Sequence, residues 1–204
     1  MNTFNHIVDD AAINKTIAAL KANGIESEVV GTGEEAKNRA LELIPEGKEV
    51  MTMTSVTVDE IGLSKVLNES GKYDAVRGKL YAMDRETDGL QMQKLGAAPE
   101  YVTGSVHAVT EDGQVVIASN TGSQLPAYVY GSSHVIWIVG AQKLVKDLDT
   151  AMKRIYDYVL PLESDRARKA YGVPGSNVSK VLIINKEVKP GRIKMIIVKE
   201  ELGY

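Results

Sequence analysis

The stretch that decides the fold is YVTGSVHAVTEDGQVVIASNTGSQLPAYVYGSSHVIWIV, residues 101–139. It predicts a strand, a hairpin over residues 106–118, a small polar loop, a short helix that closes at Gly131, and another strand. The hairpin turns at Glu111-Asp112-Gly113, because Asp-Gly between apolar residues is a strong signal for a tight turn. The stretch therefore predicts a sheet with a polar loop beside it.

Strands alternate with helices along the rest of the chain. This pattern predicts βαβ units and an α/β fold in which a mostly parallel sheet forms three layers with helices on both faces, with antiparallel hairpins added. Two pairs with capping-box spacing, Thr32 with Glu35 and Thr57 with Glu60, mark helix starts. Helices are expected at 9–23, 32–44, 58–69, 84–98 and 142–160, the last ended by Pro161, and strands at 25–30, 49–54 and 74–76.

The chain of 204 residues suits a single domain over residues 1–204, in which 180–204 form a C-terminal hairpin extension. The two predicted strands of that hairpin are Lys180–Asn185 and Ile193–Val198, joined through Pro190-Gly191. Apolar residues make up 44% and charged residues 25% of the chain, enough for a sizeable core. Pairing of this hairpin with a second copy would make a homodimer, because exposed sheet edges tend to be covered.

Charge and composition exclude several classes of function. The net charge of -3 provides no basic patch, and the aromatic residues are few, so nucleic acid is not an expected partner. The absence of cysteine excludes thiolate catalysis, zinc–thiolate sites and cysteine-held iron–sulfur clusters. No signal peptide precedes the first helix, and no apolar run reaches the ~20 residues that span a bilayer. A cytoplasmic protein without a membrane segment is expected.

The best pointer to a site is the polar loop Asn120-Thr121-Gly122-Ser123, which lies between a strand and a helix. Backbone N–H groups at a helix start attract phosphate and carboxylate groups. In an open α/β sheet, ligands also bind beyond the carboxyl ends of the strands. The alternative is that Ser123 only caps the helix and Gly122 only permits a tight turn.

Two further loops would line the same crevice. Ser55 and Thr57 lie where a strand meets a helix start, and their hydroxyl groups suit an anion or a sugar. Gly104 and Ser105 follow the strand at Tyr101-Val102. The alternatives are a helix cap at Thr57 and a strand bend at Gly104.

Acid–base groups are scarce. Glu111 and His107 are the candidate catalytic residues, although Glu111 also fits a hairpin turn and His107 a half-buried strand position. Arg166 could reach a bound anion, since guanidinium suits carboxylate and phosphate, or it could belong to a solvated charged face. The histidines match no metal-ligand spacing, so no metal is expected. Gly31-Thr32-Gly33 lacks the later acidic residue of a dinucleotide site, so no cofactor is expected.

Several strings of residues resemble the LUD-domain family, the lactate-utilisation proteins once described as a domain of unknown function. The resemblance covers residues 6–204. It rests on Ser55–Gly62, Thr103–Gly113, Thr121-Gly122-Ser123, Pro161-Leu162-Glu163, Ala170-Tyr171-Gly172, Pro190–Ile193 and Glu201–Tyr204.

The resemblance implies a fold similar to that of ribose-phosphate isomerases, glucosamine-phosphate deaminases and CoA-transferases. Some members belong to a system that oxidises lactate to pyruvate, in which partner proteins carry iron–sulfur clusters. Some relatives have a cysteine cluster near the position of Tyr171–Asn185, which this chain lacks.

Two functions follow from these observations. The first is binding of a small anionic metabolite, such as an organic acid, an acyl compound or a sugar phosphate, in lactate or carbohydrate utilisation. The alternative is a non-catalytic subunit or assembly component of a lactate-oxidising complex with iron–sulfur partners. The sequence leaves open whether the chain is an enzyme.

Overall fold

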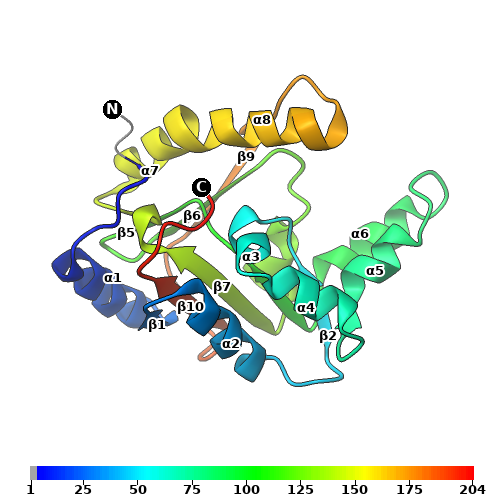
Figure 1. The fold of residues 1–204 in the computed structure, drawn as a ribbon, viewed down its shortest axis with the longest axis horizontal. Helices are drawn as coiled ribbons and strands as arrows, with labels where there is room; N and C mark the ends of the chain where they lie inside the picture. The colour runs from blue at the N-terminus through cyan, green and yellow to red at the C-terminus, as the bar shows by residue number, and fades with distance from the viewer. Residues whose placement is uncertain (1–3) are drawn as a thin grey trace.

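The fold is built on a six-stranded sheet, seen in a computed structural model that describes residues 4–204 (Figure 1). The strand order is β1-β10-β7-β4-β2-β3, and every neighbouring pair is parallel. We call it sheet A. Its strands are β1 (Glu26–Val30), β2 (Glu49–Thr52), β3 (Asp74–Ala75), β4 (Tyr101–Gly104), β7 (His134–Gly140) and β10 (Ile193–Val198).

A second sheet of four strands, sheet B, has the order β8-β5-β6-β9. Its strands β5 and β6 form the predicted antiparallel hairpin, while β8 joins β5 in parallel and β9 joins β6 in antiparallel pairing. The strands are β5 (Ala108–Thr110), β6 (Val115–Ser119), β8 (Leu144–Val145) and β9 (Lys180–Ile184).

The helices lie on both faces of sheet A, which confirms the predicted fold class (Figure 1). The helical segments are α1 (Asp10–Ala22), α2 (Gly33–Leu43), α3 (Val56–Glu60), α4 (Leu63–Glu69), α5 (Val76–Tyr81), α6 (Gly89–Ala97), the π-turn η1 (Ala127–Gly131), the 3-10 turn η2 (Ala141–Lys143), α7 (Leu148–Arg154), the π-turn η3 (Ile155–Val159) and α8 (Leu160–Tyr171).

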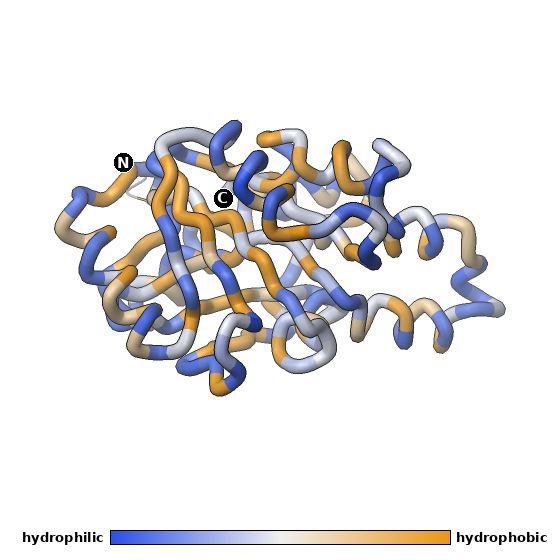
Figure 2. The backbone as a smooth tube through the Cα atoms, turned by 90° about the horizontal axis from the view of Figure 1, so that it is seen from below, coloured by the Kyte–Doolittle hydropathy of each residue, from blue (hydrophilic) through white to orange (hydrophobic). Residues whose placement is uncertain are grey.

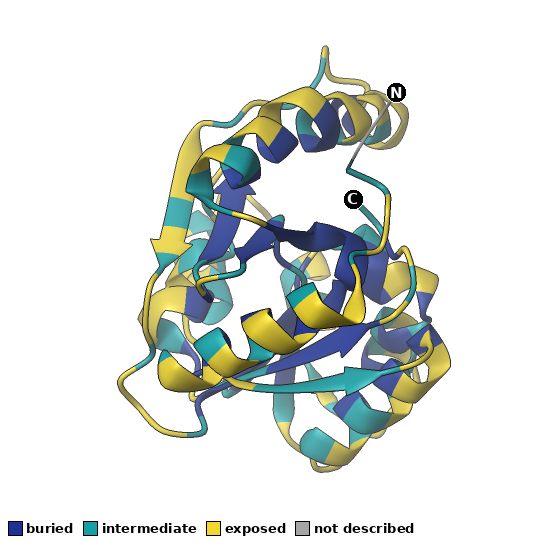
Figure 3. Cartoon of the chain, turned by 90° about the vertical axis from the view of Figure 1, so that its left-hand side faces the viewer, coloured by how far each residue is buried: buried dark blue, intermediate teal, exposed yellow. Residues whose placement is uncertain are grey.

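Two main apolar cores lie on opposite faces of sheet A. One joins α2, α3 and α4 to side chains such as Ile136, Ile138 and Ile196. The other joins α1 and sheet B to Trp137, Val139 and Met195. Buried residues fill the central strands, whereas many outward-facing helix residues are exposed (Figure 3). Along the helices, hydrophobic and hydrophilic residues therefore alternate every few positions (Figure 2).

The predicted C-terminal hairpin over 180–204 is wrong. β9 pairs with β6 in sheet B, whereas β10 lies between β1 and β7 in sheet A. The physical reason is that Ile193, Met195 and Ile197 on one face of β10 and Ile196 and Val198 on the other are all fully buried. A strand that is apolar on both faces belongs inside a parallel sheet. β10 therefore offers no edge for a second copy, whereas β9 lies at the edge of sheet B. A homodimer stays a prediction.

The predicted helix over 142–160 is wrong at both ends. Residues 141–143 form the 3-10 turn η2, and Leu144-Val145 form β8, so the helix begins at Leu148. Pro161 does not end it, because α7, η3 and α8 follow one another without a break to Tyr171. Pro161 lies in the first turn of α8, directly after the π-turn η3, where a missing backbone N–H is tolerated.

The predicted helix start at Thr57 lies two residues too late. Ser55 is the N-cap of α3 and accepts a hydrogen bond from the Val58 N–H at 3.4 Å. The single predicted helix is also divided, because Gly62 has a φ of 72° between α3 and α4. Thr57 is consequently free of capping, and its hydroxyl points to other partners.

Gly104 is the position in this region that tolerates no larger residue. A Cβ there would overlap the hydroxyl group of Tyr128 and lie 3.2 Å from Met53 Cβ. Since Tyr128 is fully buried, we expect Gly104→Ala to lower the free energy of unfolding by about 1–3 kcal/mol. Chemical denaturation measures the change. The matched control is Gly78→Ala in α5, where nothing lies within 4 Å and a small gain is expected; equal effects of the two changes would contradict the clash.

Candidate functional site

The carboxyl edge of sheet A brings four loops together. The residues after β2, β4, β7 and β10 meet there, because these strands are neighbours in the parallel sheet. Two of the loops also lead directly into sheet B: Ser105–His107 connect β4 to β5, and η2 connects β7 to β8. Since β5 and β8 pair with each other, the two crossings run between the same sheets. Open α/β sheets bind ligands at this edge.

Lys143, the last residue of η2, is the central side chain of the site. Its side chain is buried, with the whole residue only 1% exposed. The amino group Nζ donates hydrogen bonds to Thr57 Oγ1 at 2.8 Å and to Ser105 Oγ at 3.1 Å. Within residues 4–204, no carboxylate forms an ion pair with it. Burial, together with the nearby charge of Arg154, lowers the pKa of Lys143 from 10.5 to about 7, against a smaller opposing effect of Glu60.

Arg154, at the end of α7, is a second buried cation. Its Nη1 donates to the backbone carbonyl of His107 at 2.6 Å, and its guanidinium lies 5.2 Å from the ring centroid of Tyr158. Its Nε and Nη2 are buried without a hydrogen-bond partner. Arg154, too, has no ion pair in the described part of the chain, and burial lowers its pKa to about 10. A π-turn, η3, begins at the next residue, a feature frequent at functional sites.

His107 lies near both of these cations. Its Nδ1 accepts a hydrogen bond from the Ala118 N–H at 3.1 Å, so the proton of the neutral ring is on Nε2. Desolvation and the charges of Lys143 and Arg154 lower the pKa of His107 to about 3. The ring is therefore neutral near pH 7 and offers a donor rather than a base. We call Lys143, Arg154 and His107 the basic cluster.

The segment Leu202–Tyr204 connects the basic cluster to α8. Thr57 Oγ1 donates to the Leu202 carbonyl at 3.1 Å, and Glu60 accepts from the Gly203 N–H at 2.6 Å. The Tyr204 hydroxyl donates to Glu163 at 2.7 Å.

Arg166, a predicted ligand-binding residue, lies beside this segment. It forms a two-pronged hydrogen-bonded pair with Glu163, with both distances 2.7 Å. The guanidinium also lies 5.4 Å from the ring centroid of Tyr171. Its charge is thus already compensated, in contrast to that of Arg154.

The loop Asn120–Ser123 uses its own hydroxyl groups to satisfy its backbone. The Gly122 N–H donates to Ser119 Oγ at 2.8 Å, and the Ser123 N–H donates to Thr121 Oγ1 at 3.3 Å. The loop leads into the π-turn η1 rather than an α-helix. Two of the four amides on which the anion-site prediction depended, those of Gly122 and Ser123, therefore already have partners within the loop. Ligand binding by this loop stays a prediction.

Of the remaining predicted residues, some lie at Lys143 and one, Glu111, lies in a turn. Thr57 and Ser105 meet at Lys143, and Ser55 caps the same helix start. Glu111 lies in the hairpin turn and pairs with Lys15 at 2.8 Å, so it has a structural partner on α1.

No group of His, Asp and Glu side chains that could hold a metal ion occurs among residues 4–204. None of the helices there is long and apolar enough to cross a membrane.

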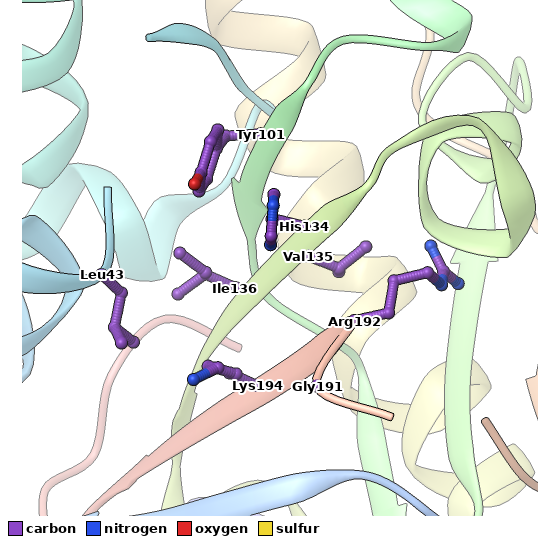
Figure 4. Close-up of a pocket in the computed structure, with 8 residues that line it drawn as sticks. All are labelled: Leu43, Tyr101, His134, Val135, Ile136, Gly191, Arg192 and Lys194. Carbon is purple, nitrogen blue, oxygen red and sulfur yellow. The ribbon is translucent and has the colours of Figure 1, made fainter. Parts of the chain in front are cut away.

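A cavity of about 220 Å³ lies at the opposite, amino edge of sheet A (Figure 4). Tyr101 and His134 stack in its wall, with ring centroids 4.3 Å apart. Its two cations are paired: Arg192 binds Glu187 at 2.7 Å, and Lys194 lies 3.2 Å from Glu26. Because no charge is left without a partner there, the basic cluster is the better candidate site.

Sequence reasoning missed Lys143 and Arg154. Lys143 falls inside the predicted helix over 142–160, and that prediction does not place it at the end of a strand. The signal that could have found it is a single charge inside the apolar run Val135–Val145. Arg154 is three residues after Ala151, and Ile155 is four residues after it. This helical spacing puts all three residues on one face, so the position of Arg154 indicates burial.

The fold and the site define an α/β protein with a basic, hydroxyl-lined site at the carboxyl edge of a parallel sheet. The chain belongs to the LUD domain family, whose model matches residues 13–198. A comparison with curated proteins found no match.

Solved structures with similar folds include a DUF162 family protein from Deinococcus radiodurans. It is 9% identical, with a TM-score of 0.57, over 92% of this chain and 96% of that chain. D-ribose-5-phosphate isomerase in complex with phospho-erythronic acid is 15% identical, with a TM-score of 0.40, over 84% and 95%. eIF2B beta from Chaetomium thermophilum is 14% identical, with a TM-score of 0.38, over 56% and 43%. The first of these likenesses supports the fold alone.

The lowered pKa of Lys143 predicts a specific pH dependence of stability. Between about pH 7 and 10.5 the unfolded chain holds a proton that the folded chain has released, so the free energy of unfolding rises with pH. The contribution reaches at most about 1.4 kcal/mol per pH unit. We expect denaturant titrations at pH 7, 8 and 9 to show this rise in the wild type and to lose it in Lys143→Met.

Lys146→Met is the matched control, because Lys146 is an exposed lysine three residues further along the chain. It should keep the wild-type dependence on pH. A wild-type profile that Lys143→Met leaves unchanged would mean that Lys143 keeps an ordinary pKa.

Proposed function

We propose that this chain binds a small anionic metabolite at the basic cluster. An organic acid, an acyl compound or a sugar phosphate would suit it, in the setting of lactate or carbohydrate utilisation that the family resemblance implies. The observation that supports this most directly is the pair of buried cations, Lys143 and Arg154, neither of which has an ion pair in the described residues.

An unpaired buried charge is costly, by several kcal/mol even after relaxation of the protein. A bound anion would remove that cost by supplying the missing opposite charge. Arg154 offers two unpartnered nitrogen atoms, and guanidinium binds carboxylate and phosphate with parallel hydrogen bonds. The metabolite is therefore expected to present its carboxylate or phosphate group to Arg154.

The polar groups around Lys143 suit the rest of such a ligand. Thr57 and Ser105 contribute hydroxyl groups, and the neutral ring of His107 contributes a donor at Nε2. Neutral groups of this kind hydrogen-bond an organic acid or a sugar without repelling its charge. Catalysis, iron–sulfur protein partners, a homodimer and a cytoplasmic location stay predictions beside this proposal.

A thermal-shift panel of lactate, phosphorylated sugars and CoA esters tests the proposal. A ligand present at about 100 times its dissociation constant should add about 2.7 kcal/mol to the free energy of unfolding. We expect Arg154→Gln to remove most of this gain, because it deletes the charge that meets the anion. Arg168→Gln is the control, since Arg168 is exposed and pairs with Asp165 on α8.

The gain should persist in Arg168→Gln. An unchanged gain in Arg154→Gln would contradict the assignment of the site. The absence of a gain with every anion of the panel would count against metabolite binding itself.

A further inference from the structure

We infer that Lys143 is a nucleophile that forms an imine with an aldehyde or ketone group of the bound anion. The metabolite would then be an oxo acid or a sugar phosphate with a free carbonyl group. This inference rests on the proposed function and makes it more specific. It names the chemical group that should lie at Nζ once Arg154 holds the charged end of the ligand.

The surroundings of Nζ are those of a reactive amine rather than of a structural ion pair. Both of its hydrogen-bond partners are hydroxyl oxygens, at 2.8 and 3.1 Å, and no carboxylate of residues 4–204 pairs with it. A carboxylate at this distance would hold the amine in its protonated form, which has no lone pair. Burial acts in the opposite direction and favours the neutral amine, which is the form that attacks a carbonyl group.

The second cation determines how a ligand would be oriented. Both cations bind the connection between β4 and β5: Arg154 donates to the His107 carbonyl at 2.6 Å and Lys143 to Ser105 Oγ at 3.1 Å. The charge of Arg154 also lowers the pKa of Lys143. With its carboxylate or phosphate on Arg154, a small ligand would place a neighbouring carbonyl carbon near Nζ. A cationic guanidinium beside an amine that can lose its proton therefore points to a ligand that is both an anion and an electrophile.

The chemical step needs no oxidant or reductant. The lone pair of Nζ forms a bond to the carbonyl carbon, the C=O π electrons move to oxygen, and a proton passes from nitrogen to that oxygen to give a carbinolamine. The nitrogen lone pair then forms the C=N bond as the C–O bond breaks, and the hydroxyl group takes up a proton and leaves as water. The nitrogen loses its second proton in return, so that no net proton is consumed. One water molecule is released for each imine.

Ser105 is the better placed of the two hydroxyl groups for moving these protons. The Thr57 hydroxyl already donates to the Leu202 carbonyl at 3.1 Å, so its proton is committed. As a donor, the Ser105 hydroxyl makes only a long contact of 3.5 Å, to the carbonyl of the next residue. Its proton can rotate toward the carbonyl oxygen of a ligand, while its oxygen accepts a proton from Nζ.

The segment Leu202–Tyr204 lies beside Nζ, because the Thr57 hydroxyl bonds both to the Leu202 carbonyl and to Nζ. Displacement of this segment would open the buried amine to a ligand. The segment is held by hydrogen bonds from Gln142 and Thr57 and to Glu60 and Glu163. A hydrogen bond of this kind contributes modestly to stability, and a bound anion would replace the interactions that are lost at the cluster.

Reductive trapping tests the inference on the unmodified chain. The protein is incubated with glyoxylate, pyruvate or ribose 5-phosphate and sodium cyanoborohydride, and the labelled peptides are identified by mass spectrometry. We expect Lys143 to be labelled at least tenfold faster than Lys146, its exposed neighbour. With pyruvate the added mass should equal that of pyruvic acid less one oxygen atom. Inorganic phosphate, which competes for Arg154, should slow the labelling.

The outcomes separate this inference from the proposed function. A thermal shift with the same anions but no preferential label on Lys143 would overturn the imine and leave anion binding in place. Uniform labelling of all lysines would also overturn it. The loss of both the shift and the label would overturn the proposed function and this inference together. Lys143→Arg keeps a cation but not a reactive amine, so it should retain the thermal shift and lose the label.

Discussion

The site depends on one physical constraint: the amino group of Lys143 is removed from water and bonded only to hydroxyl groups. Thr57 and Ser105 accept its hydrogen bonds because neither hydroxyl is engaged as a helix cap, a role that Ser55 fills. Hydroxyl partners satisfy the donors of the amine without neutralising its charge. The cost of burial is therefore only partly offset, by the more distant charge of Glu60, and that imbalance makes the position chemically distinctive.

The two sheets explain why such a position exists. Ser105 and Lys143 both lie in short connections that leave sheet A and enter sheet B, where β5 and β8 pair. Their backbones are fixed at both ends by strands, so the side chains are held where the two sheets meet. α7 packs on the far side of sheet B and carries Arg154 to the same junction. Because sheet A, sheet B and α7 all carry side chains of the cluster, the positions of those side chains are fixed more precisely than they would be on mobile loops.

The sequence predicts the elements better than their partners. The parallel α/β class, the hairpin at 106–118 and the helix cap at Thr32 follow from local patterns that operate over a few residues. The pairing of β10 between β1 and β7 depends on burial of both its faces, which the turn at Pro190-Gly191 does not encode. Lys143 was missed for a related reason: a helical period across 142–160 hid the strand β8, whose pairing lies outside the local sequence.

The loop Asn120–Ser123 and the basic cluster differ in how their polar groups find partners. A loop rich in Ser, Thr and Asn carries the groups that satisfy its own amides, as the bonds to Ser119 and Thr121 demonstrate. A buried lysine or arginine finds no partner in its own loop, because the oxygen atom that it needs comes from a distant part of the fold. An isolated charge within an apolar run is thus the stronger indication of a candidate site, since folding alone leaves such a charge without an opposite charge beside it.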